Sequence, residues 1–211
     1  MVIFIFAFLF SLAIHEAAHA WMADRLGDPT ARLSGRLSLN PFRHLDPLGA
    51  LLPFFLIFSG SPIIFGWGKP VPFDPFNLRN PRRDTALISL SGPAANLILA
   101  TFLAVIVRLG HLFLGTTGFN IEMILAPIIQ LNITWGLFNL LPLHPLDGGK
   151  VLVGFLPADL AYRVDEILHE YGLILLIFLI FPFAGTPPLF LILSPLVRLV
   201  LATLLPGTPL I

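Results

Sequence analysis

The sequence predicts an all-α polytopic membrane protein, with about five to six transmembrane helices and a small membrane-associated β-hairpin or re-entrant segment between the first and second core helices. Two observations predict this class. Of the 211 residues, 56% are hydrophobic and only 11% are charged, whereas a soluble domain carries about 25% charged residues. The apolar residues also gather in runs near the roughly 20 residues that a span requires. We expect one domain over residues 1–211, with a core at 1–155 and a closing helical pair at 169–205.

Charge and cysteine content exclude several functions. The formal net charge is zero and the basic residues are scattered, so the sequence lacks the clustered basic residues that are typical of nucleic-acid binding. Cysteine is absent, which excludes disulfides and thiolate metal ligands. The apolar composition instead makes the lipid bilayer an expected partner.

The first apolar segment covers residues 2–23 and ends where charges, glycine and proline follow. It has neither a basic leading region nor a small-residue cleavage site, so we interpret it as a retained first helix and not as a signal peptide. His15, Glu16 and His19 lie inside this segment. Ionisable groups are costly in hydrocarbon and normally face a partner or a cavity. The three residues therefore predict a functional site.

The region after the first segment predicts irregular structure at the membrane surface. Polar and apolar residues alternate at 31–39, which favours a short strand or hairpin. The next apolar run, 48–66, is interrupted by Pro53 and by a breaker at 59–62. We interpret this run as a re-entrant excursion, although a full span is the alternative.

The second half of the chain predicts further helices. Residues 85–107 form a clear span and residues 121–143 form another. The charged stretch 150–170 indicates a surface connection or a short amphipathic helix. The apolar runs 171–183 and 188–205 then form the closing pair.

The basic residues predict the orientation of the chain. If the interrupted run is re-entrant, the stretches 24–47, 67–84 and 144–168 share one side and hold all Lys and Arg except Arg108 and Arg198. Cytoplasmic loops carry the excess of Lys and Arg, so that side is predicted to be cytoplasmic. If the interrupted run spans fully, most of this bias disappears.

The spacing of the two histidines predicts a metal site. Positions i and i+4 share a helix face, so His15 and His19 can bind one ion. A hydrolytic zinc site needs three protein ligands and one open position. Asp147 ends a long apolar run between two prolines and two glycines, and the predicted topology brings it to the same membrane depth. We therefore expect Asp147 to be the third ligand.

Other ionisable groups are weaker candidates. The same topology places His111 and Glu122 at the opposite end of their helices. His144 could be a fourth or transient ligand, but the flanking prolines favour an interfacial role. Asp147 itself could be a turn residue, because Asp-Gly pairs are common in turns.

Three motifs together match a known pattern: His-Glu-Ala-Ala-His at 15–19, Ser-Gly-Pro-Ala-Ala-Asn at 91–96 and Asn-Leu-Leu-Pro-Leu-His-Pro-Leu-Asp-Gly at 139–148. Over about residues 1–155, the sequence resembles the site-2 protease family of intramembrane zinc metalloproteases, peptidase family M50. The segment 66–71 also looks like the membrane-associated strand loop of bacterial members. The resemblance implies a minimal bacterial or archaeal type without a PDZ or CBS domain, in a prokaryotic cell membrane.

The resemblance also implies one Zn²⁺ per chain, with Glu16 as general base and with three ligands, His15, His19 and Asp147. Elementary chemistry agrees, because zinc activates a bound water while a carboxylate takes its proton. Asn96 and Asn139 are amides at membrane depth that could hold substrate backbone or a developing oxyanion. They could equally bond between helices.

The leading hypothesis is a zinc-dependent intramembrane endopeptidase that cuts in or near transmembrane segments, in regulated intramembrane proteolysis or clearance of signal-peptide remnants. Transmembrane proteins or peptides would be its substrates, opened by β-pairing with residues 67–71. The alternative is a metal-ion or proton transporter, but transporters often carry repeated halves, which this sequence does not show. A catalytically inactive relative is a third possibility, against which the intact Glu16 argues.

Overall fold

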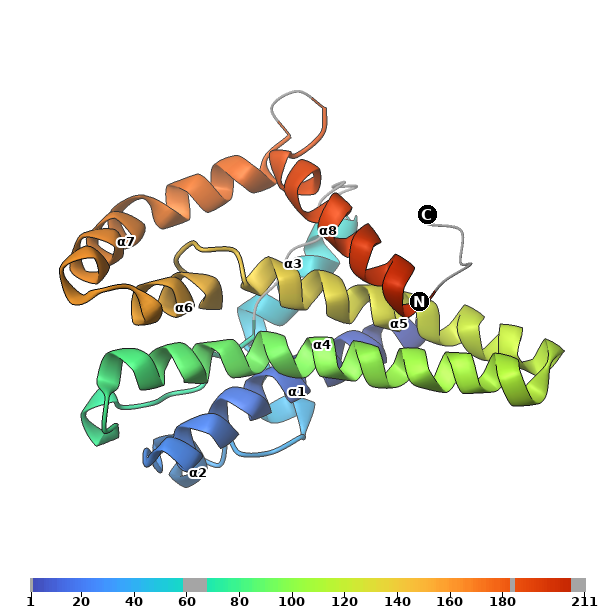
Figure 1. The fold of residues 1–211 in the computed structure, drawn as a ribbon, viewed down its shortest axis with the longest axis horizontal. Coiled ribbons are helices and arrows are strands. Elements are labelled where there is room, and N and C mark those ends of the chain that lie inside the picture. The colour runs from blue at the N-terminus through green and yellow to red at the C-terminus, as the bar shows by residue number, and fades with distance from the viewer. Residues whose placement is uncertain (1, 59–67, 183–184, 206–211) are drawn as a thin grey trace.

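The structure is a computed structural model that describes residues 2–58, 68–182 and 185–205 (Figure 1). Within these ranges the regular elements are helices, and β-pairing is limited to one isolated bridge. The expected all-α class is therefore confirmed for the described part of the chain.

Two long helices form the centre of the molecule. Helix α4 (Pro81–Leu114) and helix α5 (Thr116–Asn139) run side by side along the longest axis (Figure 1). They are joined at Gly115, whose φ of 53° is a conformation that glycine adopts without steric cost. Small and branched side chains fill the core against α8 (Pro188–Leu204), among them Ala100, Ala104, Ile129, Ile133 and Val197.

Helix α1 (Val2–Leu26) packs against α4 and brings the N-terminal motif to the centre. Three helical segments are long and apolar enough to cross a membrane: Ile5–Leu26, Pro81–Leu114 and Thr117–Asn139. They coincide with the predicted spans at 2–23, 85–107 and 121–143, with shifted ends. The protein is thus an integral membrane protein.

The predicted five to six spans exceed the three that the described helices support. Helix α3 (Pro47–Phe58) has 12 residues, which reach about 18 Å at 1.5 Å per residue. A hydrocarbon core is about 30 Å thick, so this helix alone is too short to cross. The rest of the interrupted run, with the adjoining Trp67, lies outside the described residues.

The connection after α1 corrects one expectation. Residues 31–39 contain no strand; they begin in the one-turn helix α2 (Thr30–Leu33) and continue as turns. The buried Asp28 carboxylate accepts hydrogen bonds from the Thr30 N–H and hydroxyl, at 3.2 and 2.6 Å. These local hydrogen bonds favour a helical turn at Thr30. The alternation of polar and apolar residues, on which the strand was predicted, carries no information about such bonds.

Asp28 also joins this connection to the segment before α4. Its carboxylate accepts from the Asp74 N–H at 2.8 Å and from the Asn77 side chain at 2.8 Å. Burial of the carboxylate opposes ionisation, but the hydrogen bonds from Thr30, Asn77 and Asp74 outweigh it and hold the pKa of Asp28 below its usual value. The short 3-10 helices η1 (Pro41–Arg43) and η2 (Pro75–Asn77) complete these connections.

The hairpin expected beside the membrane is represented, among described residues, by a single antiparallel bridge between Leu45 and Gly68. The Lys69 N–H donates to the His44 carbonyl at 2.8 Å. The buried Arg36 guanidinium donates to the carbonyls of Lys69 and Pro70. The predicted strand loop at 66–71 is described only from Gly68 onward, where these contacts fix its backbone.

The C-terminal half differs from the predicted division at 150–170 and 171–183. Helix α6 (Asp147–Phe155) is followed by one continuous helix, α7 (Ala158–Ile180). No proline interrupts residues 158–180, so the change from charged to apolar composition occurs within one helix. The change in composition near residue 171 therefore reflects the surroundings of the two ends of α7, and it does not mark the end of a helix.

Candidate metal centre

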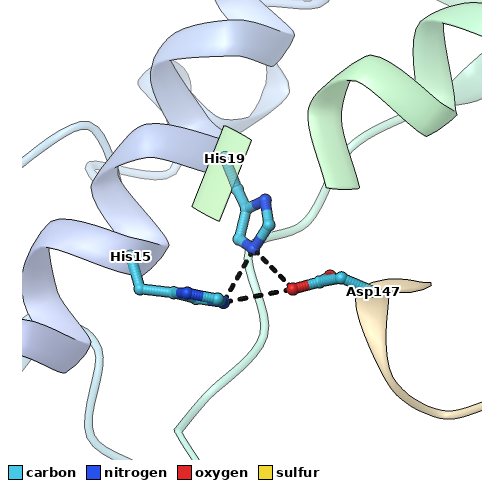
Figure 2. Close-up of side chains that lie close together, drawn as sticks. All are labelled: His15, His19 and Asp147. Carbon is cyan, nitrogen blue, oxygen red and sulfur yellow. Dashed lines mark hydrogen bonds and ion pairs between the residues drawn. The ribbon is translucent and has the colours of Figure 1, made fainter. Parts of the chain in front are cut away.

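Three predicted ligands meet between α1 and the start of α6. Figure 2 shows the imidazoles of His15 and His19 and the carboxylate of Asp147 pointing toward one another. The two histidine Nε2 atoms are 3.0 Å apart. Asp147 Oδ2 lies 3.2 Å from His15 Nε2 and 3.3 Å from His19 Nε2. The three donor atoms therefore form a nearly equilateral triangle.

This triangle fits a zinc ion. Zinc bonds to nitrogen and oxygen are about 2.0–2.2 Å long, which places the ligand atoms of a tetrahedral site roughly 3.3 Å apart. All three measured separations are close to that value. Two imidazoles and one carboxylate are also a ligand set of catalytic zinc sites, which keep the fourth position for water or substrate.

Hydrogen bonds from α4 orient both imidazoles toward the centre of the triangle. His19 Nδ1 lies 2.7 Å from the Ile88 carbonyl, which can only accept, so Nδ1 carries the proton. His15 Nδ1 lies 2.7 Å from Asn96 Oδ1 and donates in the same way. Each ring therefore presents an unprotonated Nε2 to the site, which is the arrangement that metal-bound histidine needs.

A buried polar network supports the Asn96 amide. Its nitrogen donates to Asn132 Oδ1 at 2.9 Å and to the Ser11 carbonyl at 3.3 Å. Asn132 in turn donates to the Ser11 hydroxyl at 2.9 Å. Both asparagines are fully buried. Sequence reasoning missed Ser11 and Asn132, although two polar residues inside predicted spans are the signal that could have found them.

Gly92 makes room for the two histidines beside α4. A Cβ at this position would overlap His19 Nε2 and lie 2.8 Å from His15 Cε1. Pro93, one residue later, cannot donate the usual backbone hydrogen bond to the Ser89 carbonyl. The neighbouring Ile88 carbonyl accepts from His19. The glycine of the Ser-Gly-Pro run therefore allows the two histidine side chains to lie against α4.

Glu16 lies on α1 between the two histidines and is buried. It does not belong to the group of three donors within coordinating distance of one another. Its charge acts on His19 within the site and on the basic residues Arg36 and His44 of the neighbouring connection. Glu16 is therefore a buried carboxylate next to His15 in the chain but outside the ligand set.

The two other predicted asparagines differ in their surroundings. The Asn96 amide bonds to His15, Ser11 and Asn132, which favours the interhelical role over the substrate or oxyanion contact that the sequence also allowed. Asn139 is half-buried at the end of α5, where its nitrogen donates to the Trp135 carbonyl at 3.0 Å. It precedes the short loop that leads to the third ligand.

The remaining histidine candidates lie away from the triangle. His111 pairs with Glu122 at 2.9 Å near the α4–α5 connection. His144 lies 3.0 Å from Asp165 on α7. Neither belongs to the described group that contains His15.

Comparison with known proteins now bears on this geometry. The family model described as peptidase family M50 matches residues 3–119 and 111–179, which include all three predicted ligands. The chain belongs to peptidase family M50. As an M50 member it is a zinc metalloprotease with zinc as its cofactor, and the resemblance to site-2 proteases is confirmed.

Relatives of this M50 peptidase carry matching names. It is 38% identical over 173 residues to the "Putative zinc metalloprotease YwhC" of Bacillus subtilis, an alignment that covers 80% of this chain and 75% of YwhC. It is 31% identical over 183 residues to Rip2 of Mycolicibacterium smegmatis, covering 85% of this chain and 66% of Rip2. With Rip2 of Mycobacterium tuberculosis (strain Erdman) the identity is 36% over 158 residues, covering 72% and 56%. No solved structure matches the chain significantly.

Proposed function

We propose that this M50 peptidase is an intramembrane endopeptidase that hydrolyses peptide bonds in or near transmembrane segments. The observation that carries this proposal is the triangle of His15, His19 and Asp147 at the end of an apolar helix that is long enough to span a membrane. Family membership favours this function over metal or proton transport.

The proposed chemistry follows from the donor set. When bound by the three ligands, zinc supplies Lewis-acid polarisation of the scissile carbonyl and lowers the pKa of a bound water. Glu16 accepts the proton of the attacking water and delivers it to the leaving amine. Asn96 holds the His15 ring in the tautomer that leaves Nε2 free, and the Ile88 carbonyl does the same for His19.

We place the substrate beside the Gly68–Pro70 backbone. Arg36 and the His44 carbonyl hold this segment, and Arg36 interacts electrostatically with Glu16. An opened transmembrane substrate would pass this segment to reach the general base. Asn139 at the end of α5 is the proposed amide contact to the substrate backbone. The excess of Lys and Arg in the connections favours a cytoplasmic active-site side, and the similarity to bacterial proteins favours a prokaryotic cell membrane.

The decisive experiment is cleavage of a model transmembrane substrate by purified protein in detergent. We expect Glu16→Gln to abolish cleavage while zinc remains bound, because the amide cannot take a proton and the ligands are intact. Chelator treatment should abolish cleavage, and added zinc should restore it.

Glu122→Gln is the matched control, since it removes a carboxylate near the opposite end of α4 and α5. It should leave both zinc content and cleavage near the wild-type level. Cleavage that survives Glu16→Gln would overturn the general-base assignment, and cleavage that survives full zinc removal would overturn the metal mechanism.

A further inference from the structure

A second cluster of metal-binding side chains lies outside the proposed active site. His144, in the loop after α5, places Nε2 3.0 Å from Asp165 Oδ1 on α7. His169, one turn later on α7, places Nδ1 3.4 Å from the same oxygen. The two imidazole centroids are 4.3 Å apart. One potential ligand atom from each residue lies within 4.8 Å of the others.

The cluster is accessible from outside. An open cavity of about 500 Å³ lies against it, lined by Tyr162, Asp165, Glu166, His169 and Glu170. The His144 side chain is 11% exposed, whereas Asp165 and His169 are 44% and 69% exposed. An ion can therefore reach the cluster, and two further carboxylates of the cavity wall attract a cation. The His144 side chain anchors the buried side of the site.

We propose that His144, Asp165 and His169 bind a second Zn²⁺ ion, in addition to the one held by the buried triangle. Two imidazoles and a carboxylate are ligands that zinc prefers, and the 3.0 and 3.4 Å separations are close to the roughly 3.3 Å of a tetrahedral site. His169 Nδ1 also lies 3.0 Å from the Asp165 carbonyl. Because His169 is largely exposed, its ring can turn either nitrogen to the ion.

The second ion would join α7 to the loop that leads to Asp147 at the start of α6. His144 precedes Asp147 by three residues, and its backbone packs against α7 at Gly172, where a Cβ would lie 2.7 Å from the His144 carbonyl. Bound zinc would add a coordinate link across this contact. The stability of the α7 contact should therefore depend on zinc even when the first site is empty.

Equilibrium dialysis of the 211-residue protein in detergent, against buffered free zinc, tests the proposal. We expect about two zinc ions per wild-type chain and about one in Asp165→Asn or His169→Gln. Asp147→Ala should retain about one ion, and the Asp147→Ala/Asp165→Asn double variant should retain none. Glu166→Gln is the matched control on the same cavity wall and should retain about two ions, as in the wild type.

Thermal unfolding gives a second readout that does not depend on cleavage. In the Asp147→Ala background, added zinc should raise the melting temperature, and Asp165→Asn should remove this rise, with helix content checked by circular dichroism. One zinc ion per wild-type chain would overturn the proposal. Equal zinc content in wild type and Asp165→Asn would do the same. Because these readouts measure binding, they stand or fall separately from the proposed peptidase mechanism.

Discussion

The two clusters of histidine and aspartate use the same residue types in opposite surroundings. His15 and His19 are buried, and α4 fixes both rings through their Nδ1 atoms. His169 is exposed, and its ring lies against Asp165 of its own helix turn and against His144. Residue type alone therefore does not distinguish the two clusters. Burial and ring orientation fixed by a second helix set the first cluster apart, whereas a carboxylate outside the ligand set, Glu16 or Glu166, lies near each of them.

The largest expected effect comes from removing a ligand of the buried cluster. His19→Ala should reduce cleavage to background and remove zinc from that site, because two ligands do not hold a catalytic zinc ion. His169→Ala is the matched histidine change in the exposed cluster and should leave cleavage near the wild-type level. Zinc content and cleavage of both variants can be measured on the same preparations. Equal loss of cleavage in the two variants would break the distinction between the clusters.

Adding one methyl group beside the buried cluster should have a strong effect as well, although a smaller one than the loss of a ligand. Gly92→Ala places a methyl group against both imidazoles, so we expect weaker zinc binding and slower cleavage without loss of helix content. Gly110→Ala on the same helix is the control, because its Cβ would meet the Ile121 side chain at 3.3 Å and the Gly118 Cα at an ordinary 3.6 Å, away from both imidazoles. Zinc affinity by competition with a chelator measures the difference. Normal affinity in Gly92→Ala would show that the rings can shift freely.

The orienting bond to His15 should have an intermediate effect. Asn96→Ala removes the acceptor of His15 Nδ1, and loss of such supporting partners typically lowers metal affinity about 10–100-fold. Asn139→Ala, which removes an amide that bonds within its own helix, should leave zinc affinity unchanged while slowing cleavage. If both variants bind zinc normally, the α4 contacts do not explain why the buried cluster is the catalytic one.

The smallest effect concerns a buried carboxylate without histidine partners. Asp28 is held by N–H and O–H donors alone, and its lowered pKa means that the folded state favours its ionised form. Its contribution is present above the unfolded pKa of about 3.9 and is lost as pH falls through the lower folded value. Melting temperature should therefore fall below about pH 4 in wild type, and less in Asp28→Asn. Parallel curves for the two proteins would contradict this.

Hydropathy and motif spacing predicted the parts of the fold that depend on one segment at a time. The apolar runs identified α1, α4 and α5, and the spacing of His15 and His19 placed both rings on one face. The position of Asp147 required a topology as well, and the structure brings it to the histidines. The catalytic and ligand roles of these residues stay predictions until zinc and cleavage are measured.

The features that sequence reasoning missed depend on contacts between segments. Membrane depth predicted that Asn96 is functional, but depth does not tell whether an amide faces substrate or another side chain. The network with Ser11 and Asn132 appears only when three helices are assembled. The strand expected at 31–39 failed for the same reason, since partners as distant as Asn77 fix the Asp28 carboxylate that begins the α2 turn.

The close contact of α6 with α4 has a consequence for how substitutions combine. A Cβ on Gly154 would overlap the Ala86 methyl group, and the same α4 helix borders the histidines at Gly92. Helix α4 thus contacts both α6, which begins at Asp147, and the imidazoles of α1, so the α4–α6 distance helps to position the carboxylate. We expect Gly154→Ala to push α6 away from α4. Adding Ala86→Gly should relieve the overlap only in part, because the new Cβ would still lie 2.9 Å from the Arg82 carbonyl. Tolerated sequences should therefore keep glycine at position 154 and a small residue at position 86.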